Sequence, residues 1–251
     1  MPGPITHILC ASLFLCSYSH HWNEKDFIRG TAIPDVRYLG VIEREKTHHK
    51  NVSLQQIQQT ASSFQAGILF HSYIDDAYNH FMESHKVCPK DSSSTYESTL
   101  FKCYVDYALY ERATTWNTIC TTLQEPSLSS DEINFPVTPK NMHIWYNLIA
   151  DFCSQKPSGK TIAALFSISN RTNNSGNAMS TIIANGSITY IADNAITRYT
   201  QDQTLNKYPN DFYRFIETKL HEEATQKQGL FVSIKDFFSS LFMRIKGVWS
   251  T

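Results

Sequence analysis

The sequence predicts an all-α fold, organised as a single helical domain over residues 1–251. Along most of the chain, apolar residues recur at steps of three and four, which is the helical period. The sequence lacks a good series of short segments with alternating polarity, the pattern typical of strands. With 41% apolar and 13% aromatic residues, the chain can bury an ordinary core and does not have the composition of a disordered segment.

The predicted elements follow in chain order. Residues 5–19 are expected to form a first helix, whereas residues 27–47 contain glycines and a proline and are expected to be irregular, with at most a short helix. A polar loop is expected at residues 86–96, and three prolines make residues 125–140 a long connection. The other helices are predicted at residues 54–82, 100–123, 142–153, 161–168, 179–200, 212–223 and 230–248.

The clearest predicted helix covers residues 54–82. Ser53 is its expected N-cap, and the helix must end before Pro89. Nine positions alternate in steps of three and four without a break and therefore share one face. Seven of them are apolar or aromatic, and the nine residues are Leu54, Ile57, Ala61, Phe64, Ile68, His71, Asp75, Tyr78 and Met82.

His71 and Asp75 stand where this face requires apolar residues. Burying a carboxylate costs several kcal/mol unless it is paired or binds a metal ion. A helix that presents His and Asp four residues apart can chelate one ion from a single face. A buried His–Asp hydrogen bond that only orients packing is the alternative, and the pair alone does not decide between them.

Further polar motifs stand upstream of this helix in a definite order. Together with Gly67-x-x-x-His71-x-x-x-Asp75 they resemble the zinc-dependent phospholipase C family, which shares an all-helical fold with the single-strand nucleases of the S1/P1 type. The resemblance covers about the first 85 residues, roughly a third of the chain. The upstream motifs are Ile5-Thr-His7, Gly30-Thr-Ala-Ile-Pro-Asp35 and Arg44-Glu-Lys-Thr-His48.

The resemblance implies a zinc site. It makes Asp35, His48, His71 and Asp75 the ligands of one zinc ion. His7 would bind a second zinc ion, with Asp75 bridging the two, and Asp35 would also be the catalytic residue as a possible general base. Two zinc ions ~3.5–4 Å apart can generate hydroxide at neutral pH and stabilise both the attacking and the leaving oxygen of a phosphate ester.

The sequence departs from the family pattern in two places. In secreted bacterial members the mature chain begins with a tryptophan whose amino group binds zinc, whereas here His7 lies six residues into the sequence. Those members also carry a His-x-x-x-Glu pair, but His143 and His221 are followed four residues later by Asn147 and Thr225. The pattern allows one to three zinc ions and favours two.

Other histidines are secondary candidates. His49 adjoins His48, and sequence alone does not separate the two, although the Thr-His order favours His48. Asp76 and His80 lie about 100° away from the apolar face. Asp76 is therefore expected to be solvated or to hydrogen-bond a ligand histidine, His80 is an outside candidate for a further metal ion, and His20 is a spare ligand.

Three further features have simple interpretations. Arg37 and Arg44 could contact a phosphate, although ion pairs are the simpler expectation. Residues 156–161 resemble the end of a phosphate-binding P-loop, but Ser154 stands where glycine is needed and no strand precedes it, so a nucleotide site is not expected. The six cysteines contain no C-x-x-C pair and could form disulfides or remain reduced, buried thiols.

Charge and hydropathy limit the partners. Lys and Arg number 22 against 23 Asp and Glu, so generic nucleic-acid binding through a basic face is not expected. No apolar run reaches ~18 residues, so a transmembrane helix is not convincing. Residues 8–16 lack a preceding Lys or Arg and a following cleavage site, so a signal peptide is not convincing either, and the sequence leaves the compartment open. Residues 230–248 are amphipathic; packing on the core is the default and contact with a membrane surface is the alternative.

The preferred hypothesis is a zinc-dependent hydrolase of phosphodiester bonds, similar to phospholipase C. Metal-activated hydroxide would attack the phosphorus of a phospholipid or another phosphodiester substrate. One alternative is an acyl-carrier-protein phosphodiesterase or an HD-type phosphohydrolase, which also use helical His/Asp pairs. Another is a non-catalytic helical scaffold that uses a structural metal or a His–Asp network only for stability.

Overall fold

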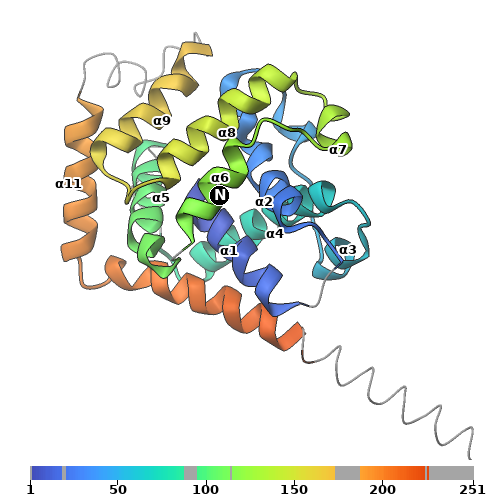
Figure 1. The fold of residues 1–251 in the computed structure, drawn as a ribbon. Coiled ribbons are helices and arrows are strands. Elements are labelled where there is room, and N and C mark those ends of the chain that lie inside the picture. The colour runs from blue at the N-terminus through green and yellow to red at the C-terminus, as the bar shows by residue number, and fades with distance from the viewer. Residues whose placement is uncertain are drawn as a thin grey trace, which may run out of the picture.

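Helix α1 (Pro4–Ser17) lies in the middle of the structure, between α5 (Thr95–Leu109) on one side and α2 (Glu24–Ala32) with α4 (Ser63–Ser84) on the other (Figure 1). The computed structural model describes residues 2–18, 21–87, 95–113, 115–172, 187–223 and 225. Within these residues every regular element is a helix, which confirms the predicted all-α domain. The central position of α1 explains why it is apolar on nearly all sides.

The remaining helices enclose this centre. Helix α8 covers η1 and α6, α11 packs against α9 and α5, and residues 208–223 form a helix whose Phe212 contacts the Tyr78 and Phe81 rings of α4. The bounds of the other elements are η1 (Ile33–Leu39), η2 (Arg44–Lys46), α3 (Leu54–Gln59), η3 (Tyr110–Arg112), α6 (Trp116–Gln124), α7 (Ser130–Ile133), α8 (Pro139–Cys153), α9 (Gly159–Thr172), α11 (Ile188–Gln201) and η4 (Leu205–Lys207).

The single helix predicted over residues 54–82 is wrong, because the chain forms two helices there. Ser53 caps α3 in a capping box with Gln56, as expected for an N-cap. The backbone turns extended at Thr60, and the Ser62 hydroxyl accepts a hydrogen bond from the Gln65 amide, which starts α4. Seven of the nine predicted face positions are buried, whereas Ala61, between the two helices, is exposed and Met82 is half-buried, so most of the face is confirmed although the continuity is not.

Two other boundaries also differ from the prediction. The helix predicted over residues 100–123 is divided into α5, η3 and α6, because Ala113 is extended and Trp116 stacks back on Tyr110 and donates to its carbonyl oxygen. Residues 27–47 are more regular than expected, since α2 reaches Ala32 before η1 begins. The predicted helix at residues 230–248, with its possible membrane contact, lies outside the described residues.

Helices α2 and α4 cross with their backbones in contact at two glycines. A Cβ atom on Gly30 would lie 2.1 Å from the Phe64 carbonyl oxygen, and one on Gly67 would lie 2.2 Å from the Phe27 carbonyl oxygen. Only glycine allows this approach. The crossing positions the candidate site, because His71 lies one turn beyond Gly67 on α4 and Asp35 follows the end of α2.

A buried ion pair joins α2 to α7 and α8. The Arg29 side chain is fully buried, with its Nε atom 2.9 Å from Glu132 Oε1 and a second nitrogen donating to the Ser127 carbonyl oxygen at 2.7 Å. The Tyr146 hydroxyl donates to the same Glu132 oxygen, and the guanidinium lies over the Tyr146 ring. Partnered in this way, both charges can be buried.

The cysteines within the described residues are free thiols. Cys16 is exposed, and the buried ones are Cys10, Cys103, Cys120 and Cys153, whereas Cys88 lies outside the described residues. Over the ranges that the structure describes, every helix is too short or too polar to cross a membrane.

Candidate metal centre

The five predicted ligands meet at one place in the interior, although they come from separate segments of the chain. α1 supplies His7, η1 supplies Asp35, the loop after η2 supplies His48, and α4 supplies both His71 and Asp75. All five residues are buried. They form two groups that could hold metal ions, Asp35–His48–His71 and His7–His71–Asp75, each with one ligand atom per residue within 4.8 Å of the others.

The first group has distances that suit tetrahedral coordination. The Nε2 atoms of His48 and His71 are 3.3 Å apart, and they lie 3.6 and 4.0 Å from the two carboxylate oxygens of Asp35. Ligands bound to zinc at about 2.0–2.2 Å in a tetrahedron are about 3.3–3.6 Å from one another. The three side chains therefore need to move by only a few tenths of an ångström to bind one ion.

Asp75 faces both groups with different oxygen atoms. Its Oδ1 atom lies 3.3 Å from His7 Nε2, whereas its Oδ2 atom lies 3.5 Å from His48 Nε2 and 4.0 Å from His71 Nε2. A carboxylate in this position can bind one ion through each oxygen. The geometry fits the bridging role that the sequence resemblance implied for Asp75.

The rings of His7 and His71 stack in parallel. Their centroids are 3.9 Å apart and the ring planes differ by 2°. The lone pair of an imidazole nitrogen lies in the plane of its ring, so a single ion cannot lie in the planes of both rings. Two ions, one in each plane, would satisfy both lone pairs at a separation near the ~3.5–4 Å of two-metal sites.

Hydrogen bonds at the outer ring nitrogens fix which atoms face the centre. The Nδ1 atoms of His7 and His71 lie 3.0 and 2.9 Å from the carbonyl oxygens of Gly3 and Thr31. A carbonyl oxygen can only accept, so each Nδ1 carries a proton, and the Nε2 atom of each neutral ring presents a lone pair to the centre. Metal-binding histidines in proteins are oriented in the same way.

His48 is oriented by a hydroxyl group instead. The Thr47 hydroxyl donates to the Arg44 carbonyl oxygen at 3.2 Å, and it therefore accepts from His48 Nδ1 at 2.8 Å. The neighbouring amide N–H of His49 donates to the Ser72 hydroxyl on α4, which holds this loop against the helix. In the neutral forms of these histidines, three imidazole lone pairs thus face one small volume.

The centre contains buried polar atoms without a hydrogen-bond partner. They are His7 Nε2 and Asp75 Oδ1, which lie 3.3 Å from each other, and Asp35 Oδ1, which lies 3.3 Å from Arg37 Nε; neither contact has the geometry of a hydrogen bond. Arg37 lies 3.3 Å from the Asp35 carboxylate and Arg44 lies 3.2 Å from that of Asp75, so each arginine offsets a negative charge. This confirms the expected ion pairs of both arginines. These cations do not satisfy the imidazole lone pairs, whereas a metal ion would.

The protonation states also suit metal binding. Burial lowers the pKa of His71 to about 3, so this imidazole is neutral at physiological pH. Burial alone would raise the pKa of Asp35, but neighbouring His48, His71 and Arg37 hold it well below its usual range. A neutral imidazole beside an ionised carboxylate is the form that binds a divalent metal ion.

The other sequence candidates lie away from this cluster. His49 is exposed while His48 is buried, which resolves the pair in favour of His48. Asp76 and His80 are both exposed on α4. Asp76 is therefore solvated, which is one of the two roles expected for it, and His80 is not a ligand of this centre. His20 lies outside the described residues.

Lys102 is a charged neighbour of the centre that no sequence pattern singles out. It is half-buried on α5. Burial lowers the pKa of its ammonium group, while the charges of Asp35 and Asp75 act in the opposite direction. In sequence it is indistinguishable from a surface lysine on an amphipathic helix.

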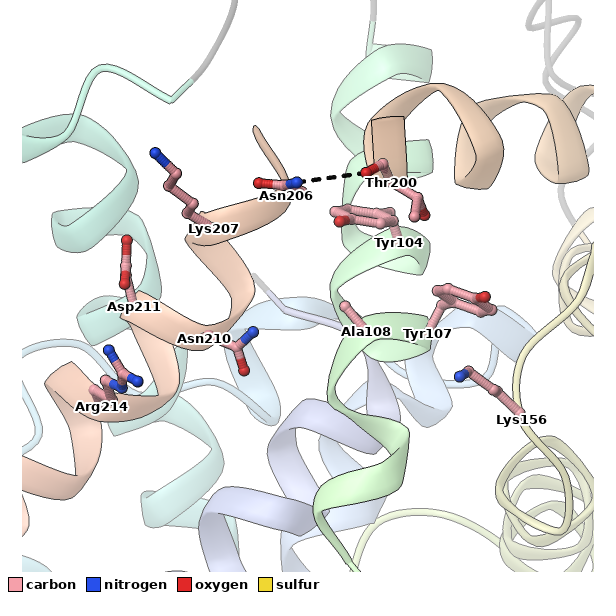
Figure 2. A pocket seen from close by; sticks show the side chains of 10 residues that line it. All are labelled: Tyr104, Tyr107, Ala108, Lys156, Thr200, Asn206, Lys207, Asn210, Asp211 and Arg214. Carbon is pink, nitrogen blue, oxygen red and sulfur yellow. Dashed lines mark hydrogen bonds between the residues drawn. The ribbon is translucent and has the colours of Figure 1, made fainter. Parts of the chain in front are cut away.

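A small cavity touches the metal-ligand cluster, and a larger groove lies elsewhere on the described part of the chain. A cavity of about 10 Å³, enough for one water molecule or ion, touches His7, Asp35, His71 and Trp145. A separate groove of about 600 Å³ runs between α5 and residues 208–223 and is lined by Tyr104, Tyr107 and Asn210, among others (Figure 2). The groove shares no lining residue with the metal cluster, so it supplies no ligand to it.

The P-loop-like segment has a structural role. The amide N–H of Gly159 at the start of α9 donates to the Asp193 carboxylate at 2.6 Å. A carboxylate therefore occupies the position where a phosphate would bind the end of this helix. This agrees with the expectation that the segment does not form a nucleotide site.

No known protein family matches this chain, and neither does any curated protein or solved structure. The chemistry of the centre therefore has to be inferred from its own geometry.

Proposed function

We propose that the protein is a zinc-dependent hydrolase of phosphodiester bonds, with a fold and site similar to those of phospholipase C. The supporting observation is the buried cluster in which Asp75 directs one oxygen to His7 and the other to His48 and His71. Imidazole and carboxylate ligands at these separations suit zinc. Two ions at this cluster would match the number favoured by the sequence motifs.

Zinc ions bound here would lower the pKa of a water molecule and neutralise charge on a phosphoryl oxygen. The residues of the chain would hold the ions, with Asp35, His48 and His71 around one of them and His7 on the other. Asp35 Oδ1 is buried at the cluster, 3.3 Å from Arg37 Nε, and in this proposal it accepts a proton from the attacking water. This is the catalytic role proposed for Asp35.

The charges around the centre favour an anionic substrate. The two carboxylates are already offset by Arg37 and Arg44, and Lys102 adds a further cation. Zinc would therefore make the centre positive overall, which favours a phosphodiester such as a phospholipid. The Arg44 side chain is 45% exposed, whereas the His48 and Asp75 side chains are 3% exposed, so we expect substrate to approach past Arg44.

The first experiment measures zinc in purified protein and in variants at neighbouring positions. His48→Ala and His71→Ala should lose bound zinc, whereas His49→Ala, which changes the exposed neighbour, should keep it. Hydrolysis of bis(p-nitrophenyl) phosphate and of short-chain phosphatidylcholine should follow zinc content across the variants. Asp35→Ala should also abolish hydrolysis. A wild-type protein that neither contains nor rebinds a transition metal would refute the proposal.

A non-catalytic scaffold is the second candidate, because one observation favours it. The centre is closely packed, with a cavity of only about 10 Å³ beside the ligands. In that case zinc would bind and stabilise the wild-type protein, and no phosphodiester would be cleaved. An acyl-carrier-protein phosphodiesterase or HD-type phosphohydrolase would instead retain zinc and cleave a phosphopantetheine or nucleotide ester in preference to phosphatidylcholine.

A further inference from the structure

Asp106 is a buried carboxylate of α5 that holds the first turn of α1. It is 1% exposed. Its Oδ1 atom accepts hydrogen bonds from the Thr6 amide at 2.9 Å and from the Thr6 hydroxyl at 2.6 Å, and its Oδ2 atom accepts from the Ile5 amide at 3.3 Å. The N-cap residue of α1, Gly3, has no side chain to cap the helix. A residue about 100 positions away therefore caps it.

The same turn orients His7. The carbonyl oxygen of Gly3 accepts from the amide of His7 at 3.2 Å and from His7 Nδ1 at 3.0 Å. Gly3 lies against Asp106 so closely that a Cβ atom there would be 2.2 Å from Asp106 Oδ2. Displacing Asp106 would thus shift the carbonyl group that holds the imidazole ring.

The ligands divide into those that depend on α1 and those that do not. His7 is carried by α1, and its Nε2 atom lies 3.3 Å from Asp75 Oδ1. Asp35 and His48 belong to η1 and the loop after η2, and His71 is held by the Thr31 carbonyl oxygen at the end of α2. A disturbed first turn of α1 should therefore affect one ion and spare the other.

We infer that Asp106 is a positioning residue that makes the ion bound by His7 and Asp75 dependent on α5. It does not touch the ions itself and acts by holding residues 3–7. This inference rests on the proposed two-ion centre. It predicts that removing the Asp106 charge weakens the second ion selectively, while the ion at Asp35, His48 and His71 is retained.

The experiment compares two buried carboxylates, of which only Asp106 holds a segment that carries a metal ligand. Asp106→Asn alters the cap of α1, and Glu132→Gln alters the equally buried Arg29 pair, which contacts none of the five ligands through its hydrogen bonds. Chelator-treated proteins are titrated with zinc, the metal content is measured after dialysis, and unfolding in urea is measured in parallel. Glu132→Gln thereby reports any loss of zinc that follows from reduced stability alone.

Wild type and Glu132→Gln should each bind two zinc ions. Asp106→Asn should bind the second ion at least about tenfold more weakly, as is usual when a residue behind a metal ligand is changed, and keep the first ion at wild-type affinity. His7→Ala should show the same selective loss, and combining it with Asp106→Asn should add nothing further. Thr6→Val removes only the hydroxyl contact and should produce a smaller shift in the same direction, which tests the inference if Asp106→Asn does not fold.

Two results would overturn the inference, and they differ. If wild type binds two ions and Asp106→Asn, or in its absence Thr6→Val, binds both with unchanged affinity, Asp106 does not position His7 and the proposed function stands. If wild type binds no zinc, the proposed function fails and this inference fails with it.

Discussion

Gly67→Ala tests whether the crossing of α2 and α4 determines both stability and the metal centre. The new Cβ atom would lie 2.2 Å from the Phe27 carbonyl oxygen and 2.8 Å from the Thr31 amide nitrogen. Both are backbone atoms, so no side chain can rotate away. Restoring an ordinary contact of about 3.4 Å or more requires the two helices to separate by about 1 Å.

The expected cost is the difference between two effects. Overpacking a well-packed interior costs about 1–3 kcal/mol, and a clash between backbones belongs at the upper end of this range. Alanine is favoured over glycine within a helix by about 1 kcal/mol. The net destabilisation should therefore be about 2 kcal/mol, which lowers the melting temperature by about 4–8 °C for a domain of this size.

The same displacement should weaken zinc binding. Thr31 provides both the amide nitrogen that the new Cβ atom would displace and the carbonyl oxygen that accepts from His71 Nδ1 at 2.9 Å. Zinc affinity of Gly67→Ala should fall along with its stability, because the His71 ring would lose its fixed orientation.

Urea unfolding followed by circular dichroism gives the stability of wild type, Gly67→Ala and Asp76→Ala. Asp76 is exposed on the same helix, so its change to alanine adds a helix-favouring residue without a clash. It should be neutral or slightly stabilising. If Gly67→Ala is as stable as wild type, or gains stability as Asp76→Ala does, the backbone contact at the crossing does not restrict this position and the reasoning is wrong.

Three other predictions concern the interior. Zinc at 100 times its dissociation constant should stabilise the protein by about 2.7 kcal/mol per site and raise the melting temperature, and EDTA should reverse the change; an unchanged melting temperature would count against the site. In metal-free protein, the stability to urea should decrease as the pH falls from 6.5 towards 3. The pKa of His71 is about 3 in the folded protein, whereas 6.5 is its ordinary value, so the unfolded chain takes up the proton first. A flat profile in wild type, or the same slope in His71→Ala, would contradict this. Glu132→Ala should cost about 3–5 kcal/mol because it leaves Arg29 buried without its partner, and a loss below about 1 kcal/mol in urea unfolding would show that the pair is dispensable.

Part of the site could be predicted because it breaks a local pattern. His71 and Asp75 interrupt an apolar helical face, and both are buried as that face required. Periodicity carries no information about how separate helices meet, so it could not bring His7 or Asp35 to the same place. The order of short motifs provided that expectation, and the structure brings those residues together.

The residues that hold the ligands in place could not be predicted in this way. His7 and His71 are oriented by carbonyl oxygens of Gly3 and Thr31, and a backbone carbonyl has no sequence signature. Asp106 lies on a helix whose sequence gives no sign that its carboxylate caps another helix 100 residues away. The break between α3 and α4 was missed for a related reason, because the apolar face continues across it while the cap at Ser62 acts only locally.

Charge balance and lone-pair balance lead to different conclusions about the centre. Arg37 and Arg44 bring two positive charges to two carboxylates, so the net charge alone does not require a metal ion. When the three histidines are neutral, three imidazole nitrogens nevertheless point lone pairs into the same volume, and two of them, in His48 and His71, are 3.3 Å apart. In a purely structural network, one imidazole would be expected to direct an N–H towards the other or towards Asp75, because buried polar groups are usually hydrogen-bonded. The chain uses an N–H of each ring on an outer oxygen of Gly3, Thr31 or Thr47, which leaves the inner nitrogens of the neutral rings able to bind a cation.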